Sequence, residues 1–188
     1  MTKGIADEVL MLRYKNKGDT AAFDALYNRH KGHLYRYFLR QCGKSEIAQE
    51  LFQDIWLNLV KSHQRYEHKA KFTTLLYRMA HNRLIDYYRK QSHVPKSYAD
   101  NDGDAVDVIA DDMKNNPESI NSRQEIINEL LRQIDVLPEA QREAFLLKEE
   151  GGFSVEEIAD IMDIGAETAK SRLRYASNKL RSALGGLL

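Results

Sequence analysis

Residues 72–90 read FTTLLYRMAHNRLIDYYRK. If this stretch is a helix, residues three and four positions apart lie on the same side, and one side then carries Thr74, Arg78, His81, Asn82, Ile85 and Arg89. The opposite, apolar side consists of Leu76, Met79, Ala80, Leu84 and Tyr87. The stretch therefore predicts a helix that packs one side into a core and presents a polar, basic side with hydrogen-bond donors.

A loop without apolar periodicity precedes this helix, at Tyr66–Lys71. From Lys61 to Lys96, lysines and arginines outnumber the acids Glu67 and Asp86, and aromatic residues lie among them. Such a surface suits a phosphate backbone and the stacking of unpaired bases. Taken alone, the stretch fits a solvated amphipathic helix with core tyrosines better, because basic patches are common.

The composition favours an all-α protein with one domain or two small ones. The chain has 188 residues, 43% of them hydrophobic, with 3 prolines and 10 glycines. The formal net charge of zero conceals the basic block, so it does not argue against nucleic acid. Cys42 is the only cysteine, which excludes an internal disulfide and a cysteine-based zinc site. No signal peptide or membrane span is evident, and we expect a soluble intracellular protein.

Amphipathic periodicity predicts three further helices in an N-terminal domain of residues 1–96. They cover 5–17, 20–41 and 46–61, with stops at Gly18 and Gly43 and with Ser45 as a plausible N-cap. Together with 72–91 they form a compact bundle. The helix 46–61 has a polar, partly acidic face made of Gln49, Glu50, Gln53, Asp54 and Asn58. This face is either solvated or a docking surface for a basic partner helix.

We predict that residues 97–118 form a flexible acidic linker and mark a domain boundary. This segment is rich in aspartate, and its apolar residues show no sustained periodicity. The linker is either a plain spacer or an occupant of a positively charged channel in a partner.

The C-terminal domain, residues 119–188, contains a helix-turn-helix pattern. Helices are predicted over 119–136 and 139–150, and Ser154 and Glu157 have capping-box spacing at the head of a short helix. A turn at 163–165 leads into a longer helix over 166–184. Its outer side and flank carry Thr168, Lys170, Ser171, Arg172, Arg174, Tyr175, Asn178, Lys179 and Arg181. These residue types suit base edges and phosphates, and here the DNA-binding interpretation is favoured.

The order of these segments resembles a known family. FDALYNRH, EIAQELFQDIWLNL, FTTLLYRMAHNRLIDYYRK, LPEAQREAFLLKEEGGFSVEEIADIM and TAKSRLRYASNKLRSAL follow one another with an acidic linker after the third. This arrangement resembles the group IV, or extracytoplasmic-function, sigma factors of bacterial RNA polymerase. The resemblance implies a sigma-2 domain that binds the beta-prime clamp helices and melts the minus-10 element. It also implies a sigma-4 domain that binds the beta flap and reads the minus-35 element.

The resemblance also implies roles for single residues. Polymerase docking is assigned to Gln49, Glu50, Gln53, Asp54 and Asn58. Minus-10 contacts are assigned to Tyr66, His68, Lys69, Lys71, Phe72, Thr74, Arg78, His81, Asn82 and Arg89. Within this set, the loop Tyr66–Lys71 would capture a flipped-out base, and Arg78 and Asn82 would help to part the strands. Minus-35 contacts are assigned to Thr168, Lys170, Ser171, Arg172, Arg174, Tyr175 and Lys179. The chain departs from the family pattern at Glu167, Ala169, Tyr175 and Ser177.

Two other classes of function are weighed against this one. A stand-alone helix-turn-helix regulator with a ligand-sensing N-terminal domain would bind duplex DNA without polymerase. A metalloenzyme is disfavoured because the pairs His30 and His33, and His63 and His68, do not match HExxH or a zinc pattern. We therefore expect no catalytic residue, metal or cofactor. The expected partners are core polymerase, promoter DNA and an anti-sigma factor, which in this family often holds the sigma factor at the inner face of the membrane.

Overall fold

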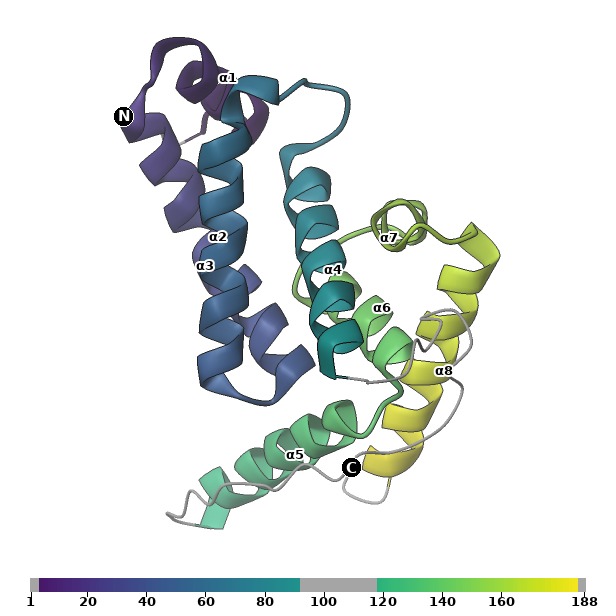
Figure 1. Ribbon diagram of the computed structural model, residues 1–188. Helices are drawn as coiled ribbons and strands as arrows, with labels where there is room; N and C mark the ends of the chain where they lie inside the picture. The colour runs from purple at the N-terminus through teal and green to yellow at the C-terminus, as the bar shows by residue number, and fades with distance from the viewer. Residues whose placement is uncertain (1–3, 92–117, 186–188) are drawn as a thin grey trace.

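The computed structural model describes residues 4–91 and 118–185, and every regular element in these ranges is helical (Figure 1). The N-terminal unit contains α1 (Asp7–Lys17), α2 (Thr20–Cys42), α3 (Ser45–Ser62), a short 3-10 helix η1 (His63–Arg65) and α4 (Phe72–Gln91). The C-terminal unit contains α5 (Glu118–Asp135), α6 (Glu139–Glu149), α7 (Val155–Met162) and α8 (Ala166–Leu184). The prediction of an all-α fold with two helical parts is confirmed for the described residues.

Helix ends in the N-terminal unit follow local chemistry. The Asp19 side chain accepts a hydrogen bond from the Ala22 N–H (3.1 Å) and caps α2. Gly18 and Gly43 end α1 and α2 with φ of 61° and 66°, a left-handed conformation that glycine adopts without a Cβ clash. The prediction of Ser45 as an N-cap was wrong, because Lys44 holds that position and α3 begins at Ser45 itself.

The core of the N-terminal unit lies between α2, α3 and α4, and α1 closes one end of it. Leu26, Leu34, Leu51, Leu76 and Leu84 are almost fully buried there. Burying a leucine side chain contributes roughly 1.5–3 kcal/mol, so these residues hold α4 firmly in the bundle.

The C-terminal unit confirms the helix-turn-helix pattern. Ser154 and Glu157 form a reciprocal capping box at the start of α7. Asp163 ends α7 in the left-handed region with φ of 54°, and α8 begins at Ala166. Helix α8 packs against α6 and α7, and its buried residues are Ala169, Ala176 and Leu180.

The two units pack against each other through α4 and α7 and through α2 and α6 (Figure 1). The Tyr77 and Phe153 rings meet edge to face with centroids 5.0 Å apart. Of the predicted linker, residues 97–117 lie outside the described residues, and Glu118 already begins α5. None of the helices in the described ranges is long and apolar enough to cross a membrane.

Candidate nucleic-acid interface

Exposed donors line one side of α4. Arg78, Asn82 and Arg89 are exposed and Thr74 is half-buried, as the spacing predicts. Arg89 lies 4.0 Å from Asp86 at the surface, so its guanidinium is still available to other partners. This row follows the direction of α4 and could contact a nucleic-acid strand running along it.

Two residues assigned to DNA contact lie in the interior instead. His81 is 2% exposed, which contradicts its predicted place on the outward side of the helix. Its Nδ1 lies 2.7 Å from Oε1 of Glu143, a buried residue of α6. Phe72 is fully buried, and its backbone N–H donates to the Glu8 side chain of α1 (2.8 Å). Helix α4 thus has buried positions on more than one side, which the pattern of apolar residues did not reveal.

Tyr66 begins the loop before α4 and is also buried, with 5% exposure. Its carbonyl oxygen accepts a hydrogen bond from Lys15 Nζ (2.7 Å). Burial raises the pKa of the Tyr66 hydroxyl to about 12, and the nearby Glu8 and Asp7 charges act in the same direction. Among the described residues the hydroxyl finds no hydrogen-bond partner. Tyr66 therefore anchors the loop and does not present its ring to solvent.

The rest of the loop is exposed and cationic. His68, Lys69 and Lys71 face solvent, and Lys69 pairs with Glu67. Lys71 Nζ donates to Glu157 Oε1 of the C-terminal unit at 2.8 Å. This hydrogen bond raises the pKa of Lys71 and lowers that of Glu157. The loop offers cations to a phosphate, but one of them already has a carboxylate partner.

The predicted docking face on α3 lies beside α4. Gln49, Glu50, Gln53 and Asn58 are exposed and Asp54 is half-buried. Arg83 of α4 donates from Nε to Asp54 Oδ2 (2.8 Å), and its Nη2 lies 3.5 Å from Glu50. The face is therefore partly neutralised from within the chain.

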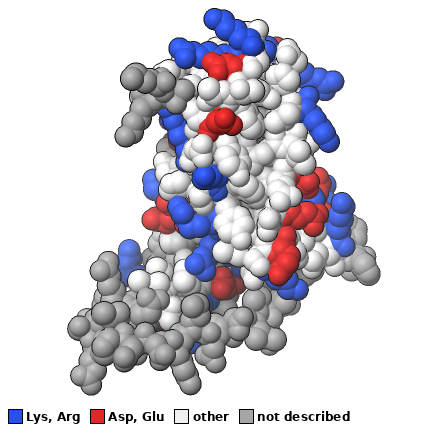
Figure 2. Space-filling view, turned by 90° about the vertical axis from the view of Figure 1, so that its left-hand side faces the viewer, with Lys and Arg blue, Asp and Glu red and all other residues white. Residues whose placement is uncertain are grey.

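Sequence reasoning missed the exposed apolar side chains on α3. Leu57 is 54% exposed and Val60 is 37% exposed. Figure 2 shows the side of the molecule that carries α2 and α3, where uncharged side chains cover much of the surface and a group of acidic side chains lies at the right-hand margin. The sequence contained a sign of this exposure, because Leu57 lies four residues after Gln53 and therefore on the same, polar face of the helix.

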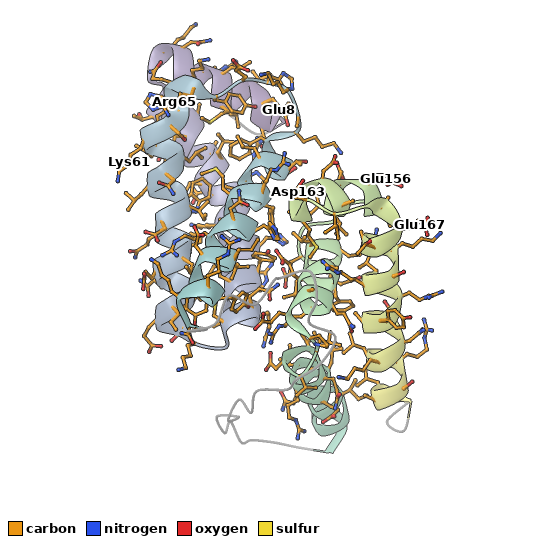
Figure 3. The ribbon with its side chains drawn as sticks, turned by 45° about the vertical axis from the view of Figure 1, so that its right-hand side comes forward. Glu8, Lys61, Arg65, Glu156, Asp163 and Glu167 are labelled. Atoms are coloured by element: carbon orange, nitrogen blue, oxygen red, sulfur yellow. The ribbon has the colours of Figure 1, made fainter. Side chains whose placement is uncertain are left out.

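Helix α8 presents its predicted residues more openly. Thr168, Lys170, Arg174 and Tyr175 are exposed, and the Arg174 guanidinium lies over the Tyr175 ring at 5.5 Å. Figure 3 shows Glu167, at the start of α8, pointing outward from the edge of the molecule.

Three predicted residues of α8 are less available. Ser171 and Arg172 are half-buried, and Arg172 Nη1 is buried without a hydrogen-bond partner in the described part of the chain. Lys179 is exposed, but its Nζ donates to the carbonyl oxygen of Val136 (3.2 Å) beyond the end of α5. The exposed Lys170, Arg174 and Tyr175 therefore form the most accessible part of the helix.

Both parts of the chain match families of known proteins. Residues 26–94 match the family model for Sigma-70 region 2, and residues 127–180 match that for Sigma-70, region 4. The ECF RNA polymerase sigma-E factor of Escherichia coli (strain K12) is 30% identical over 196 aligned positions, which span 100% of this chain and 99% of that protein. The RNA polymerase sigma factor CarQ of Myxococcus xanthus is 29% identical and covers 94% of this chain and 97% of its own.

Two solved structures share the fold. The sigma factor RpoE of Bartonella quintana, in complex with the anti-sigma factor NepR, has a TM-score of 0.67 at 22% identity and covers 87% of this chain and 96% of its own. CnrH, in complex with the cytosolic domain of CnrY, has a TM-score of 0.68 at 18% identity and covers 96% and 97%. At these identities the similarity concerns the fold alone.

Proposed function

The chain belongs to the extracytoplasmic-function sigma factors of the sigma-70 family, and from this membership we propose which residues bind polymerase and promoter. As an alternative sigma factor it directs core RNA polymerase to specific promoters and starts transcription. The family implies an initiation factor with no reaction of its own to catalyse. The observation that carries the residue assignments is that α4 and α8, on separate units, each present a row of exposed polar and basic side chains.

The N-terminal unit, residues 1–96 by our proposed boundary, acts as sigma-2. His68, Lys69 and Lys71 contact the minus-10 strand, while Arg78 and Asn82 help to part the strands. Tyr66 and Phe72 support this surface from below, since both side chains are buried. Thr74 and Arg89 extend the contact along α4, and His81 joins it only when the neighbouring unit moves away.

The C-terminal unit, residues 119–188, acts as sigma-4 and reads the minus-35 element. Lys170, Arg174 and Tyr175 enter or flank the major groove, which admits an α-helix. Thr168 and Ser171 lie at the same end of α8, while Arg172 and Lys179 contribute from the flank.

Promoter melting requires polymerase. Opening DNA costs about 1.4 kcal/mol per base-pair step, and each base stacked on an aromatic side chain returns ~1–3 kcal/mol. One captured base does not hold a bubble of many steps open. Docking through Gln49, Glu50, Gln53, Asp54 and Asn58 to the beta-prime clamp helices, and of sigma-4 to the beta flap, is therefore as necessary as the DNA contacts.

An anti-sigma factor is a further proposed partner. Of the similar structures described above, RpoE is in complex with the anti-sigma factor NepR, and CnrH is in complex with the cytosolic domain of CnrY. The chain works in the cytoplasm, where polymerase and promoters are, and a membrane-anchored anti-sigma factor would hold it at the inner face of the membrane.

In vitro transcription across genomic fragments, with the chain, core polymerase, or both, tests the function. We expect mapped start sites only with both components. Specific duplex binding by the chain alone, unchanged by core polymerase, would instead identify a stand-alone helix-turn-helix regulator.

A single substitution tests the strand-opening role on a promoter found in this way. With Asn82→Ala, closed complexes should form but open poorly, because an exposed hydrogen-bonding group on α4 is lost. Permanganate reactivity of the bubble measures the opening. Reactivity equal to that of the unsubstituted chain would remove Asn82 from this role.

A further inference from the structure

Helix α1 holds both ends of the loop that precedes α4. Lys15 Nζ donates to the carbonyl oxygen of Tyr66 (2.7 Å), where the loop begins. Glu8 Oε1 accepts from the backbone N–H of Phe72 (2.8 Å), where the loop ends. Figure 1 shows α1 and this loop at the same end of the N-terminal unit. Two side chains of one helix thus fix the chain on either side of residues 67–71.

The spacing of the two anchoring residues suits this arrangement. Glu8 and Lys15 are seven positions apart, close to two helical turns, so both lie on one side of α1, about 10 Å apart along its axis. Both side chains are half-buried. The Gln64 side chain adds a hydrogen bond to the carbonyl oxygen of Lys15 (3.3 Å). The backbone before and after the loop is therefore bound to α1 at separate points.

The charges of the two anchoring residues also match the loop. The pKa of Glu67 is lowered, chiefly by its hydrogen bond with Lys69 and further by the charge of Lys15. The pKa of Lys71 is raised, chiefly by its hydrogen bond with a glutamate of α7 and further by the charge of Glu8. The cation of α1 thus acts on the acidic start of the loop, and the carboxylate of α1 acts on its basic end.

Helix α1 is itself fixed on the bundle. Leu10 and Met11 are fully buried. Arg29 of α2 donates to the Asp7 side chain (2.6 Å) and to the carbonyl oxygen of Ile5 (2.6 Å). Because α1 is held in this way, its hydrogen bonds restrict the loop before any DNA arrives. A loop that is already ordered loses less conformational entropy on binding than a free one.

We propose that Lys15 and Glu8 are positioning residues for promoter recognition, which hold the loop in the shape that captures a base of the minus-10 strand. The inference rests on the proposed function of this loop and adds α1 to it. Both residues lie outside residues 26–94, which match Sigma-70 region 2. Lys15 acts through the loop and is not itself a DNA contact. If the loss of one hydrogen bond leaves the loop correctly shaped in one molecule of ten, the apparent affinity for the strand falls about ten-fold.

Hydrogen exchange of the free, full-length chain tests the anchoring. Lys15→Met and Glu8→Ala should each speed amide exchange in peptides that cover the loop. Lys15→Arg keeps a donor and Glu8→Gln keeps an acceptor, so both should retain slow exchange. Lys17→Met is the matched control, because Lys17 lies in the same last turn of α1, is exposed and has no hydrogen-bond or ion-pair partner in the described part of the chain.

Two outcomes of this experiment would contradict the proposal. Unchanged exchange of the loop in Lys15→Met and Glu8→Ala would show that α1 does not restrain it. Exchange that rises equally in peptides of α2 would show a general loss of stability and no role specific to the loop.

Binding of the minus-10 strand by the holoenzyme tests the consequence for recognition. The probe is a single-stranded oligonucleotide with the non-template minus-10 sequence of a promoter mapped by in vitro transcription. We expect Lys15→Met and Glu8→Ala to weaken binding about ten-fold and to reduce discrimination against single-base changes in the probe. Lys17→Met, Lys15→Arg and Glu8→Gln should stay close to the unsubstituted chain. Unchanged affinity and discrimination in Lys15→Met and Glu8→Ala would overturn the proposal.

The salt dependence of this binding separates positioning from direct contact. A lysine that neutralises one phosphate of a single strand contributes about 0.7 to the slope of log affinity against log salt. Lys15→Met should leave the slope unchanged, because the hydrogen bond that it removes lies within the protein. A slope reduced by about 0.7 would identify Lys15 as a phosphate contact and overturn its positioning role. Failure of the proposed function would look different, because the unsubstituted chain would then give no mapped start sites with core polymerase.

Discussion

Helices α4 and α8 are of similar length, 20 and 19 residues, but the protein uses their surfaces differently. In α4 the buried residues are Phe72, Leu76, Tyr77, Ala80, His81 and Leu84. In α8 they are Ala169, Ala176 and Leu180. Each helix packs against three others, but α8 buries only two alanines and one leucine, so most of its predicted outer side stays exposed, whereas α4 also buries aromatic residues and a histidine. The accessible surface of α4 is therefore set by its neighbours.

The N-terminal ends of these helices differ in the same way. The first N–H of α4, on Phe72, is bound by Glu8 from α1. Helix α8 begins after Gly165 without a side-chain cap. Figure 3 shows Glu8 near the start of α4 within the N-terminal unit, whereas Glu167 points away from the molecule. The first N–H group of α4 thus finds its acceptor on another helix, whereas the start of α8 has no side-chain acceptor.

The largest effect is expected in the shared core. Leu76→Ala should lower the free energy of unfolding by ~2–5 kcal/mol, because it leaves a cavity at a fully buried position of α4. Leu173→Ala, at a half-buried position of α8, should cost less. Denaturant titration followed by circular dichroism compares the two. Equal losses would break the contrast between the helices.

The next effect concerns which arginine of α8 reads DNA. Arg174→Ala should weaken promoter binding by the holoenzyme by ~1–3 kcal/mol, because an exposed guanidinium is removed. Arg172→Ala should also weaken it if the side chain reaches a base edge, and in addition should change stability, since Nη1 is buried. Footprinting of the minus-35 element and thermal unfolding separate the two. Unchanged minus-35 protection for both variants would contradict the proposal that α8 reads the minus-35 element.

A smaller effect tests the two helix starts. Glu8→Ala should cost about 0.5–2 kcal/mol of stability, because the Phe72 N–H loses its acceptor. Glu167→Ala should cost only about 0.3 kcal/mol, since this exposed carboxylate interacts only with the helix dipole and, at 3.8 Å, with the exposed Lys170. Thermal unfolding of both variants provides the comparison. A larger loss of stability for Glu167→Ala than for Glu8→Ala would contradict the proposal that a side chain from another helix stabilises the start of α4 more than Glu167 stabilises the start of α8.

The smallest effect is the contribution of Asp7, in α1, to the pH dependence of stability. Burial alone would raise the pKa of Asp7, but hydrogen bonds with His30 and Arg29 outweigh it and hold the pKa below 3.8. The folded-state pKa is thus below the unfolded one. The resulting stabilisation is present above about pH 4 and is lost as the pH falls through the folded pKa. Asp7→Asn should make the loss of stability with falling pH less steep, in unfolding curves measured from pH 6 downward. An unchanged slope would contradict this role of Asp7.

The sequence alone determined the all-α class, the helix-turn-helix with its Ser154–Glu157 capping box, and the exposed basic residues of α8. These features depend on periods and caps that act within a few residues. Only the tertiary structure decided that His81, Phe72 and Tyr66 are buried, and that Glu143 is the partner of His81. A helical period tells which residues share a side, but not how many sides are covered. Nor does it reveal a carboxylate 62 positions later in the chain, which makes burial of the His81 ring tolerable only once both units have folded and met.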